Sequence, residues 1–165
     1  MQQLSAAPPH KKAIEATVSI RRPVEDVFSF YRDFRNLPRF LGDVMAVVPI
    51  GPTTYRWTIQ GPLGIRAAWT IRVTEERPNR LVRYQTVAPP GLRTCWEIQF
   101  APAPQSGETI VREVMRPPLG RLGRLALALI GKFPAAEMAS NLRRLKQVME
   151  TGTVTDRSYS VPGKF

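Results

Sequence analysis

Hydrophobic and polar residues alternate over residues 13–20, and this period of two predicts a half-buried β-strand at the start of the domain. The spacing then changes, because residues 23–33 place apolar side chains three and four positions apart behind a proline and two acidic residues. Proline and acidic side chains both suit the first turn of a helix. A second short helix is predicted over residues 36–41, with Asn36 as its N-cap.

Residues 44–115 are predicted to be almost entirely strand, since turn signals divide them into about six segments. Within the segments apolar residues alternate with polar ones, as Tyr55, Trp57 and Ile59 do with their neighbours. This alternation is typical of an antiparallel sheet with one buried apolar face and one solvent-exposed polar face. The turn signals are Gly51-Pro52, Gly61-Pro62-Leu63-Gly64, Pro78-Asn79, Pro89-Pro90-Gly91 and Gln105-Ser106-Gly107.

The last third of the chain returns to helical spacing over residues 122–149. We expect a long helix with a kink or break around Gly131 and Pro134, because proline cannot continue the helical hydrogen bonding. Gly152 is a suitable C-terminal stop.

One domain over residues 13–152 accounts for these elements. Its predicted class is α+β, with a curved seven-stranded antiparallel sheet around a long C-terminal helix and two short helices after the first strand. Residues 1–12 and 153–165 lack a period and are expected to be a flexible arm and a flexible tail.

The residue types present exclude several kinds of chemistry. Cys95 is the one cysteine, and His10, in the expected N-terminal arm, is the one histidine. The domain therefore lacks the parts of a Ser–His or Cys–His nucleophile and of a multi-His or multi-thiolate metal site. We expect no metal and no nucleotide cofactor.

Charge and hydropathy bear on partners and location. The formal charge of +11 would attract polyanions, but no zinc-finger or RNA-binding motif is present, so specific nucleic-acid binding is not expected. The longest apolar run, residues 125–130, is far shorter than the roughly 18 residues that cross a bilayer. The N-terminal residues have no secretory core segment, which favours a cytoplasmic location.

Three stretches carry a resemblance to a known family. They are RPVEDVFSFYRDFRNLPRFLGDV at 22–44, GPLGIRAAWTIRVTEERPNRLVRYQT at 61–86, and MRPPLGRLGRLALALIG followed by NLRRLKQVMETG within 115–152. Together they resemble the START-like polyketide cyclase/dehydrase and lipid-transport superfamily (SRPBCC), in particular its bacterial cyclase/dehydrase-like branch. The resemblance implies the helix-grip fold and a cavity between sheet and helix. It does not identify the ligand, because fold does not specify function.

The apolar face of the predicted sheet is expected to line that cavity together with the long helix. The alternative is that the same side chains simply fill a close-packed core. The candidate ligand-binding residues are Trp57, Ile59, Trp69, Ile71, Tyr84, Trp96, Ile98, Phe100, Val111 and Met115 on strands, with Leu129, Met138 and Leu142 on the helix.

Glu113 is the most informative polar position, because it is in phase with the apolar Val111 and Met115. If it faces inward, burial raises its pKa into the range of a general acid or base. A bulge or a slip of one residue would instead turn it to solvent or into a salt bridge, and this alternative is favoured because residues 109–116 alternate poorly. Tyr84 could donate a hydrogen bond to a ligand carbonyl. Glu113 and Tyr84 are therefore the candidate catalytic residues.

Residues 118–133 combine apolar side chains with Arg121, Arg124 and Lys132 and contain no acid. They predict either transient contact with an anionic membrane or the buried start of the long helix.

Three functional hypotheses follow from these patterns. The leading one is binding or carriage of a hydrophobic small molecule, such as a lipid, quinone, polyketide or aromatic ring compound. The alternative is a cofactor-independent cyclase, dehydratase or aromatase. The third is an interaction module that acts through its basic surface. The sequence leaves the oligomeric state open.

Overall fold

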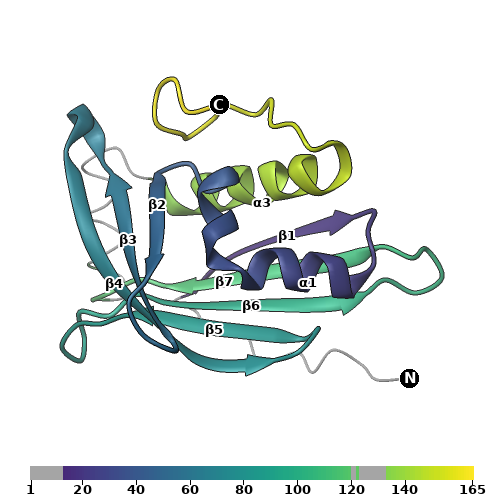
Figure 1. The fold of residues 1–165 in the computed structure, drawn as a ribbon, viewed down its shortest axis with the longest axis horizontal. Helices are drawn as coiled ribbons and strands as arrows, with labels where there is room; N and C mark the ends of the chain where they lie inside the picture. The colour runs from purple at the N-terminus through teal and green to yellow at the C-terminus, as the bar shows by residue number, and fades with distance from the viewer. Residues whose placement is uncertain (1–12, 120–121, 123–132) are drawn as a thin grey trace.

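Seven antiparallel strands form one curved sheet in the order β1-β7-β6-β5-β4-β3-β2 (Figure 1). The computed structural model describes residues 13–119, 122 and 133–165. The predicted seven-stranded antiparallel sheet and the α+β class are confirmed. The strands are β1 Ile14–Ile20, β2 Val44–Pro49, β3 Thr54–Gln60, β4 Arg66–Arg77, β5 Leu81–Thr86, β6 Cys95–Pro102 and β7 Thr109–Arg116.

Two register irregularities bend the sheet. One lies between Val44 and Ala46 on β2 and the other between Val73 and Glu75 on β4. An extra residue in one strand increases the local twist and bends that strand. In Figure 1, β2, β3 and the first part of β4 turn up beside the C-terminal helix, whereas β5, β6 and β7 lie below it.

The first helix, α1 (Val24–Arg32), follows β1 directly, as predicted. Glu25 and Asp26 lie in its first turn, where their charge favours the positive end of the helix dipole. Its buried face contributes Phe28 and Tyr31 to the core.

The second helical piece differs from the prediction. It is a 3₁₀ helix, η1 (Phe34–Arg39), and its N-cap is Asp33, whose carboxylate accepts a hydrogen bond from the Arg35 backbone N–H at 3.2 Å. Asn36, the expected cap, donates instead to the backbone oxygen of Phe30 at 3.0 Å. The predicted start was too late because Asp33 ends α1 and caps η1 at the same time. A further short 3₁₀ helix, η2 (Pro62–Gly64), connects β3 and β4.

The long C-terminal helix, α3 (Pro134–Thr151), begins and ends at the predicted breaking residues. Proline occupies its first turn, and Gly152 closes it in the left-handed conformation with φ 76°. It packs along β1, where the Lys146 ammonium group donates to the Ser19 backbone oxygen at 2.6 Å. Most of the predicted helical stretch before Pro134 lies outside the described residues. In the part of the chain that the structure describes, no helix has both the length and the apolar character needed to cross a membrane.

Residues 153–165, expected to be a flexible tail, lie back across the domain and make specific polar contacts. The guanidinium group of Arg144, fully buried on α3, donates to the backbone oxygens of Phe40 and Ser158, both at 2.7 Å. Lys164 donates to the backbone oxygens of Leu41 and of Val44, the first residue of β2, and burial lowers the pKa of its ammonium group to about 8. A period search cannot detect this segment, because hydrogen bonds rather than an apolar stripe hold it.

Candidate ligand-binding site

The strand register places the predicted apolar face on the concave side of the sheet. Residues that pair directly in an antiparallel sheet point to the same face. Trp57 pairs with Trp69, and Tyr84 pairs with Trp96. The same ladders continue inward through Ile71, Ile98, Phe100, Val111 and Met115, so all strand residues named as candidates share one face.

Burial varies along this face. Ile71, Ile98 and Val111 are completely buried, and Ile59 and Phe100 are nearly so. At the end of the sheet where β4 begins, Trp69 is 42% exposed although its partner Trp57 is only 3% exposed. Ala67, on the same face of β4, is exposed as well, and Trp96 and Met115 are half-buried.

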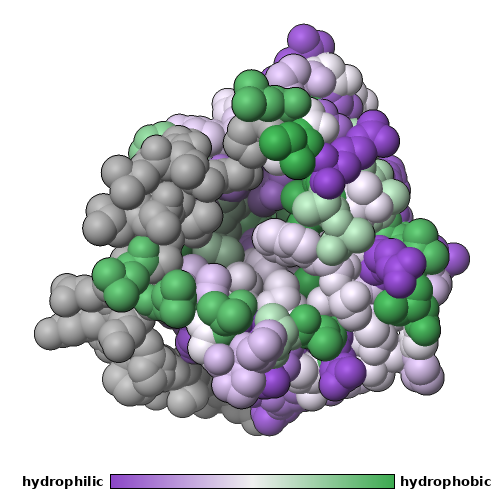
Figure 2. Space-filling view, turned by 90° about the vertical axis from the view of Figure 1, so that its left-hand side faces the viewer, coloured by the Kyte–Doolittle hydropathy of each residue, from purple (hydrophilic) through white to green (hydrophobic). Residues whose placement is uncertain are grey.

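The exposed inner-face residues show that, in the described part of the chain, the sheet and α3 leave this end open. Viewed from that end, the molecule is hollowed, and hydrophobic residues lie around the recess (Figure 2). On the helix side, Met138 and Leu142 of α3 are buried. Leu129, the remaining helical candidate, lies outside the described residues.

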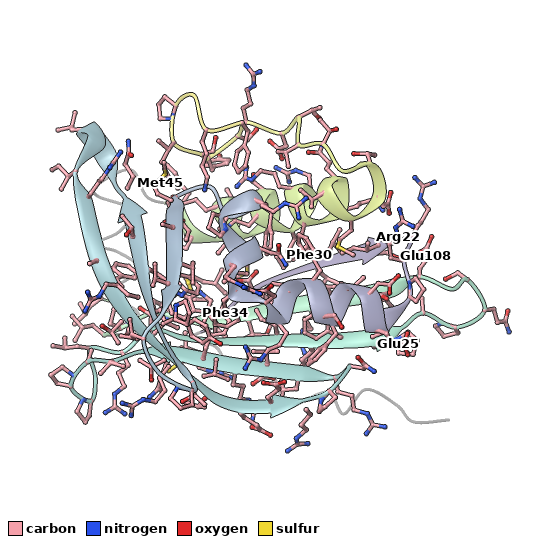
Figure 3. All side chains as sticks on the ribbon, viewed as in Figure 1. Arg22, Glu25, Phe30, Phe34, Met45 and Glu108 are labelled. Carbon is pink, nitrogen blue, oxygen red and sulfur yellow. The ribbon has the colours of Figure 1, made fainter. Side chains whose placement is uncertain are left out.

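Aromatic rings from α1 and η1 join those of the strands. Phe34 packs against Tyr55, Trp57 and Tyr84 with ring centroids 4.8, 5.8 and 5.2 Å away (Figure 3). The pattern of the sequence does not single out Phe34, because its short 3₁₀ helix has no recognisable hydrophobic period. Tyr84 in turn stacks on Trp96 at 5.3 Å, so the rings form one continuous cluster.

Two tyrosines place hydroxyl groups inside this apolar cluster. The hydroxyls of Tyr31 and Tyr84 are 3.0 Å apart and buried. Desolvation, followed by the negative charge of nearby groups including Glu113, raises the pKa of both phenols well above the usual value. Both therefore stay protonated at neutral pH. Only one of the two O–H groups is used in the bond between them, so the pair retains one donor.

Glu113 lies on the inner face, in register with Ile98 on β6 and Ala16 on β1. The residue is 5% exposed, and among the described residues no side chain or backbone group donates a hydrogen bond to its carboxyl group. Burial raises the pKa of Glu113 to about 8. Near neutral pH the group is largely a neutral carboxylic acid that can donate a proton, and the ionised fraction can accept one.

The favoured expectation that Glu113 faces solvent or a salt bridge is therefore wrong. Both ladders of β7 run without a bulge, so the phase set by Val111 and Met115 continues through position 113. The hydrophobic pattern was ambiguous because Val114, on the outer face, is buried too. Pairing on both sides of the strand decides the phase.

The remaining polar groups of the site are few. The indole N–H of Trp57 is enclosed without an acceptor, the one such fully buried side-chain atom in the described part of the chain. Within that part, no three His, Cys, Asp or Glu side chains lie close enough together to hold a metal ion. The inner face therefore combines a large apolar and aromatic surface with one carboxyl group and a pair of phenol hydroxyls.

Comparison with solved structures supports the fold. A protein from Deinococcus radiodurans superposes with a TM-score of 0.65 and 22% sequence identity, covering 86% of this chain and 99% of that one. A protein from Arthrobacter aurescens gives a TM-score of 0.70 at 13% identity, covering 90% and 91%. A START superfamily protein from Mycobacterium smegmatis gives 0.64 at 15% identity, covering 86% and 99%. These likenesses show the fold, which is the helix-grip fold that the resemblance implied.

No curated protein matches the sequence. A family model does, and it covers residues 11–150, which include the whole sheet and almost all of α3. The chain belongs to the polyketide cyclase/dehydrase and lipid transport family.

Proposed function

We propose that this protein binds or carries a hydrophobic small molecule between the concave face of the sheet and α3. The observation that carries the proposal is the exposure of Trp69 on a face where its partner Trp57 and the neighbouring Ile71 are buried. A tryptophan left open on the inner face of a sheet offers apolar area that a ligand can cover. Family membership is compatible with this role.

The expected ligand combines an apolar or aromatic body with at least one polar group. Rings from Trp57, Trp96 and Phe34 supply flat apolar contacts, which suit a lipid, quinone or polyketide. The Glu113 carboxyl group and the Tyr31–Tyr84 pair can hold a carbonyl or hydroxyl group. Burial of apolar area would supply most of the affinity, and these groups would set the orientation.

Intrinsic fluorescence can test the proposal, because all three tryptophans of the chain lie on the inner face. Titration with menadione, an apolar quinone that quenches indole fluorescence, should give saturable quenching. Native mass spectrometry of the purified protein should in addition show retained lipid or a retained apolar compound. Absence of both signals, with palmitate and a sterol as further probes, would contradict the proposal.

Two neighbouring alanines provide a matched pair of variants for this test. Ala67 pairs with Ile59 on the inner face, whereas Ala68 pairs with Thr58 on the outer face, and both are exposed. Ala67→Phe should block the opening and weaken menadione quenching at least about tenfold, the equivalent of roughly 1.4 kcal/mol. Ala68→Phe adds the same side chain to the other face and should leave quenching unchanged. Equal effects of the two variants would show that the probe binds elsewhere.

A second function, acid–base catalysis on a bound cyclic or polyketide-like substrate, is favoured by Glu113 alone. A buried carboxyl group with a pKa of about 8 can transfer a proton near neutral pH, and Tyr84 could hold a carbonyl oxygen. Poly-β-ketone model compounds would be incubated with the protein and their products followed by mass spectrometry. Catalysis predicts products with the wild type and with Glu97→Gln, which changes an outer-face carboxylate, but none with Glu113→Gln. Products that persist with Glu113→Gln would exclude this role.

A further inference from the structure

Two leucines at the open end of the domain are held in an unfavourable backbone conformation and exposed to solvent. Leu63, in η2, has φ 58° and is 98% exposed, and Leu119, just after β7, has φ 56° and is 60% exposed. Left-handed backbone is rare for bulky residues, and glycine or asparagine usually occupies it. Each leucine is therefore unfavourable in two ways, because its backbone has a left-handed φ and its apolar side chain is exposed to water. Backbone strain of this kind is concentrated at functional sites.

The sheet topology brings these residues to the same end of the molecule. In a meander, the β3–β4 and β5–β6 connections and the end of β7 all lie at one end of the sheet. The Leu119 backbone N–H donates to the Gly91 oxygen at 3.1 Å, which joins the segment after β7 to the β5–β6 connection. We name Leu63, Ile65, Leu92 and Leu119 the apolar rim; all four are at least half exposed. The rim lies at the end where Trp69 is open.

The chain segments that carry the rim contain basic residues but no acidic ones. Residues 44–74, 77–96 and 114–136 contain no aspartate or glutamate, and they include all four rim residues. Arg66 follows the rim at the start of β4, and no described residue pairs with its side chain. Glu25 and Glu108 lie at the opposite end of the domain (Figure 3).

We propose that the apolar rim docks this protein on an anionic lipid bilayer, with its leucines in the acyl boundary and Arg66 at the headgroups. Exposed apolar side chains next to an arginine without an ion-pair partner among the described residues, on chain segments that contain no acidic residue, match the chemistry of such a surface. The inference rests on the proposed function, since docking at the opening would let a hydrophobic ligand pass between the bilayer and the site.

Vesicle flotation tests this surface. The wild type should float with vesicles of phosphatidylcholine that contain about one third phosphatidylglycerol, and far less with phosphatidylcholine alone. Leu63→Asn and Leu119→Asn should each weaken binding by about tenfold, which corresponds to the burial of one leucine side chain. Both variants should fold at least as stably as the wild type, because asparagine accepts the left-handed conformation. Arg66→Gln should weaken binding to the anionic vesicles by about fivefold.

Matched controls lie elsewhere on the molecule. Tyr159 also has a positive φ of 51° and is 52% exposed, but it belongs to the C-terminal segment. Tyr159→Asn should leave vesicle binding unchanged, and so should Arg80→Gln in the β4–β5 turn at the opposite end. Equal binding by the leucine variants and the wild type would overturn the proposal. It would also be overturned if sedimentation showed a dimer that Leu63→Asn dissociates, because a second copy would then cover the rim.

Two readouts separate this proposal from the proposed function. If only the docking proposal is wrong, menadione still quenches the tryptophan fluorescence. The protein then binds vesicles weakly, or binds them equally well in the wild type and the rim variants. If ligand binding alone fails, the wild type floats with anionic vesicles but shows no quenching. Rim variants that lose vesicle binding should keep the quenching of the wild type.

Discussion

At the scale of single residues, Glu113 combines features that a structural role alone does not require. A carboxyl group loses much hydration free energy on burial, and hydrogen bonds or a cation usually compensate it. Glu113 has neither among the described residues, and its pKa rises to about 8 for that reason. The position costs stability whenever the group is ionised, so a neutral apolar residue would stabilise the fold better.

The pH dependence of stability should reveal this cost. The folded pKa of about 8 exceeds the unfolded value of 4.5, so the folded protein holds an extra proton between these two pH values. Stability should therefore fall as pH rises through this window, by about 1.4 kcal/mol per pH unit at most. Urea unfolding near pH 6 and pH 8 would measure the fall, and Glu113→Gln should largely remove it. Glu97→Gln on the neighbouring strand should keep it, and an unchanged fall in Glu113→Gln would assign it to another group.

The two buried tyrosines predict a non-additive pair of substitutions. Tyr84→Phe leaves the Tyr31 hydroxyl buried without its partner at 3.0 Å, and this should cost about 1–3 kcal/mol of unfolding free energy. Tyr31→Phe should cost a similar amount for the same reason. The double variant should be much less destabilised than the sum of the two, because no orphaned hydroxyl remains. Additive losses in denaturant unfolding would show that the two hydroxyls do not interact.

At the scale of elements, the C-terminal segment acts as a strap across α3 and η1. Arg144 reaches from α3 to backbone oxygens on both η1 and the strap, so one buried cation joins three pieces of chain. The Val161 N–H also donates to the Gly42 oxygen at 3.0 Å. Gly42 allows this close approach, because a Cβ there would lie 2.4 Å from the Tyr159 oxygen and 2.8 Å from the Arg144 guanidinium.

Gly42→Ala should consequently displace the strap. The added methyl group meets the backbone of the strap and the buried Arg144 guanidinium group, and we expect a loss of about 1–3 kcal/mol in unfolding free energy. Limited proteolysis should then cut within residues 153–165 faster than in the wild type. Gly51→Ala is the matched control, since a Cβ there meets nothing closer than 3.6 Å. Identical cleavage of both variants would mean that the strap does not depend on Gly42.

At the scale of the whole molecule, the outer face of the sheet neutralises part of the positive charge. Arg83 pairs with Glu75 and Glu97, and Arg112 pairs with Glu15. Burial alone would raise the pKa of Glu97, but hydrogen bonds and the charge of Arg83 hold it below the usual value. With 24 basic and 13 acidic residues, a large excess of positive charge remains. Excess charge of one sign destabilises a compact state.

Added salt should therefore stabilise the protein. Raising NaCl from about 20 to 200 mM shortens the screening length from roughly 20 to 7 Å, which weakens repulsion between unpaired arginines. Thermal unfolding should move to higher temperature, and Arg72→Glu should reduce the size of that shift by lowering the net charge. A falling melting temperature would indicate that the outer-face ion pairs outweigh the repulsion.

The sequence by itself determined the elements and most of the inner face. Period-two alternation assigned Trp57, Trp69 and Trp96 to one side of their strands, and the register confirms this. Pro134 and Gly152 marked the ends of the described C-terminal helix. These features are local, because side-chain direction and backbone preference depend on a few neighbouring residues.

Only the tertiary structure decided which parts of that face stay open and where the polar groups lie. The orientation of Glu113 depends on the pairing of β7 with both of its neighbours in the sheet, and one of them, β1, lies at the far end of the sequence. The contact between Phe40 and Arg144 joins residues more than one hundred positions apart. Burial, desolvation and long-range hydrogen bonds depend on the assembled fold. They determine that, among the described residues, the candidate site contains a buried carboxyl group without a hydrogen-bond partner.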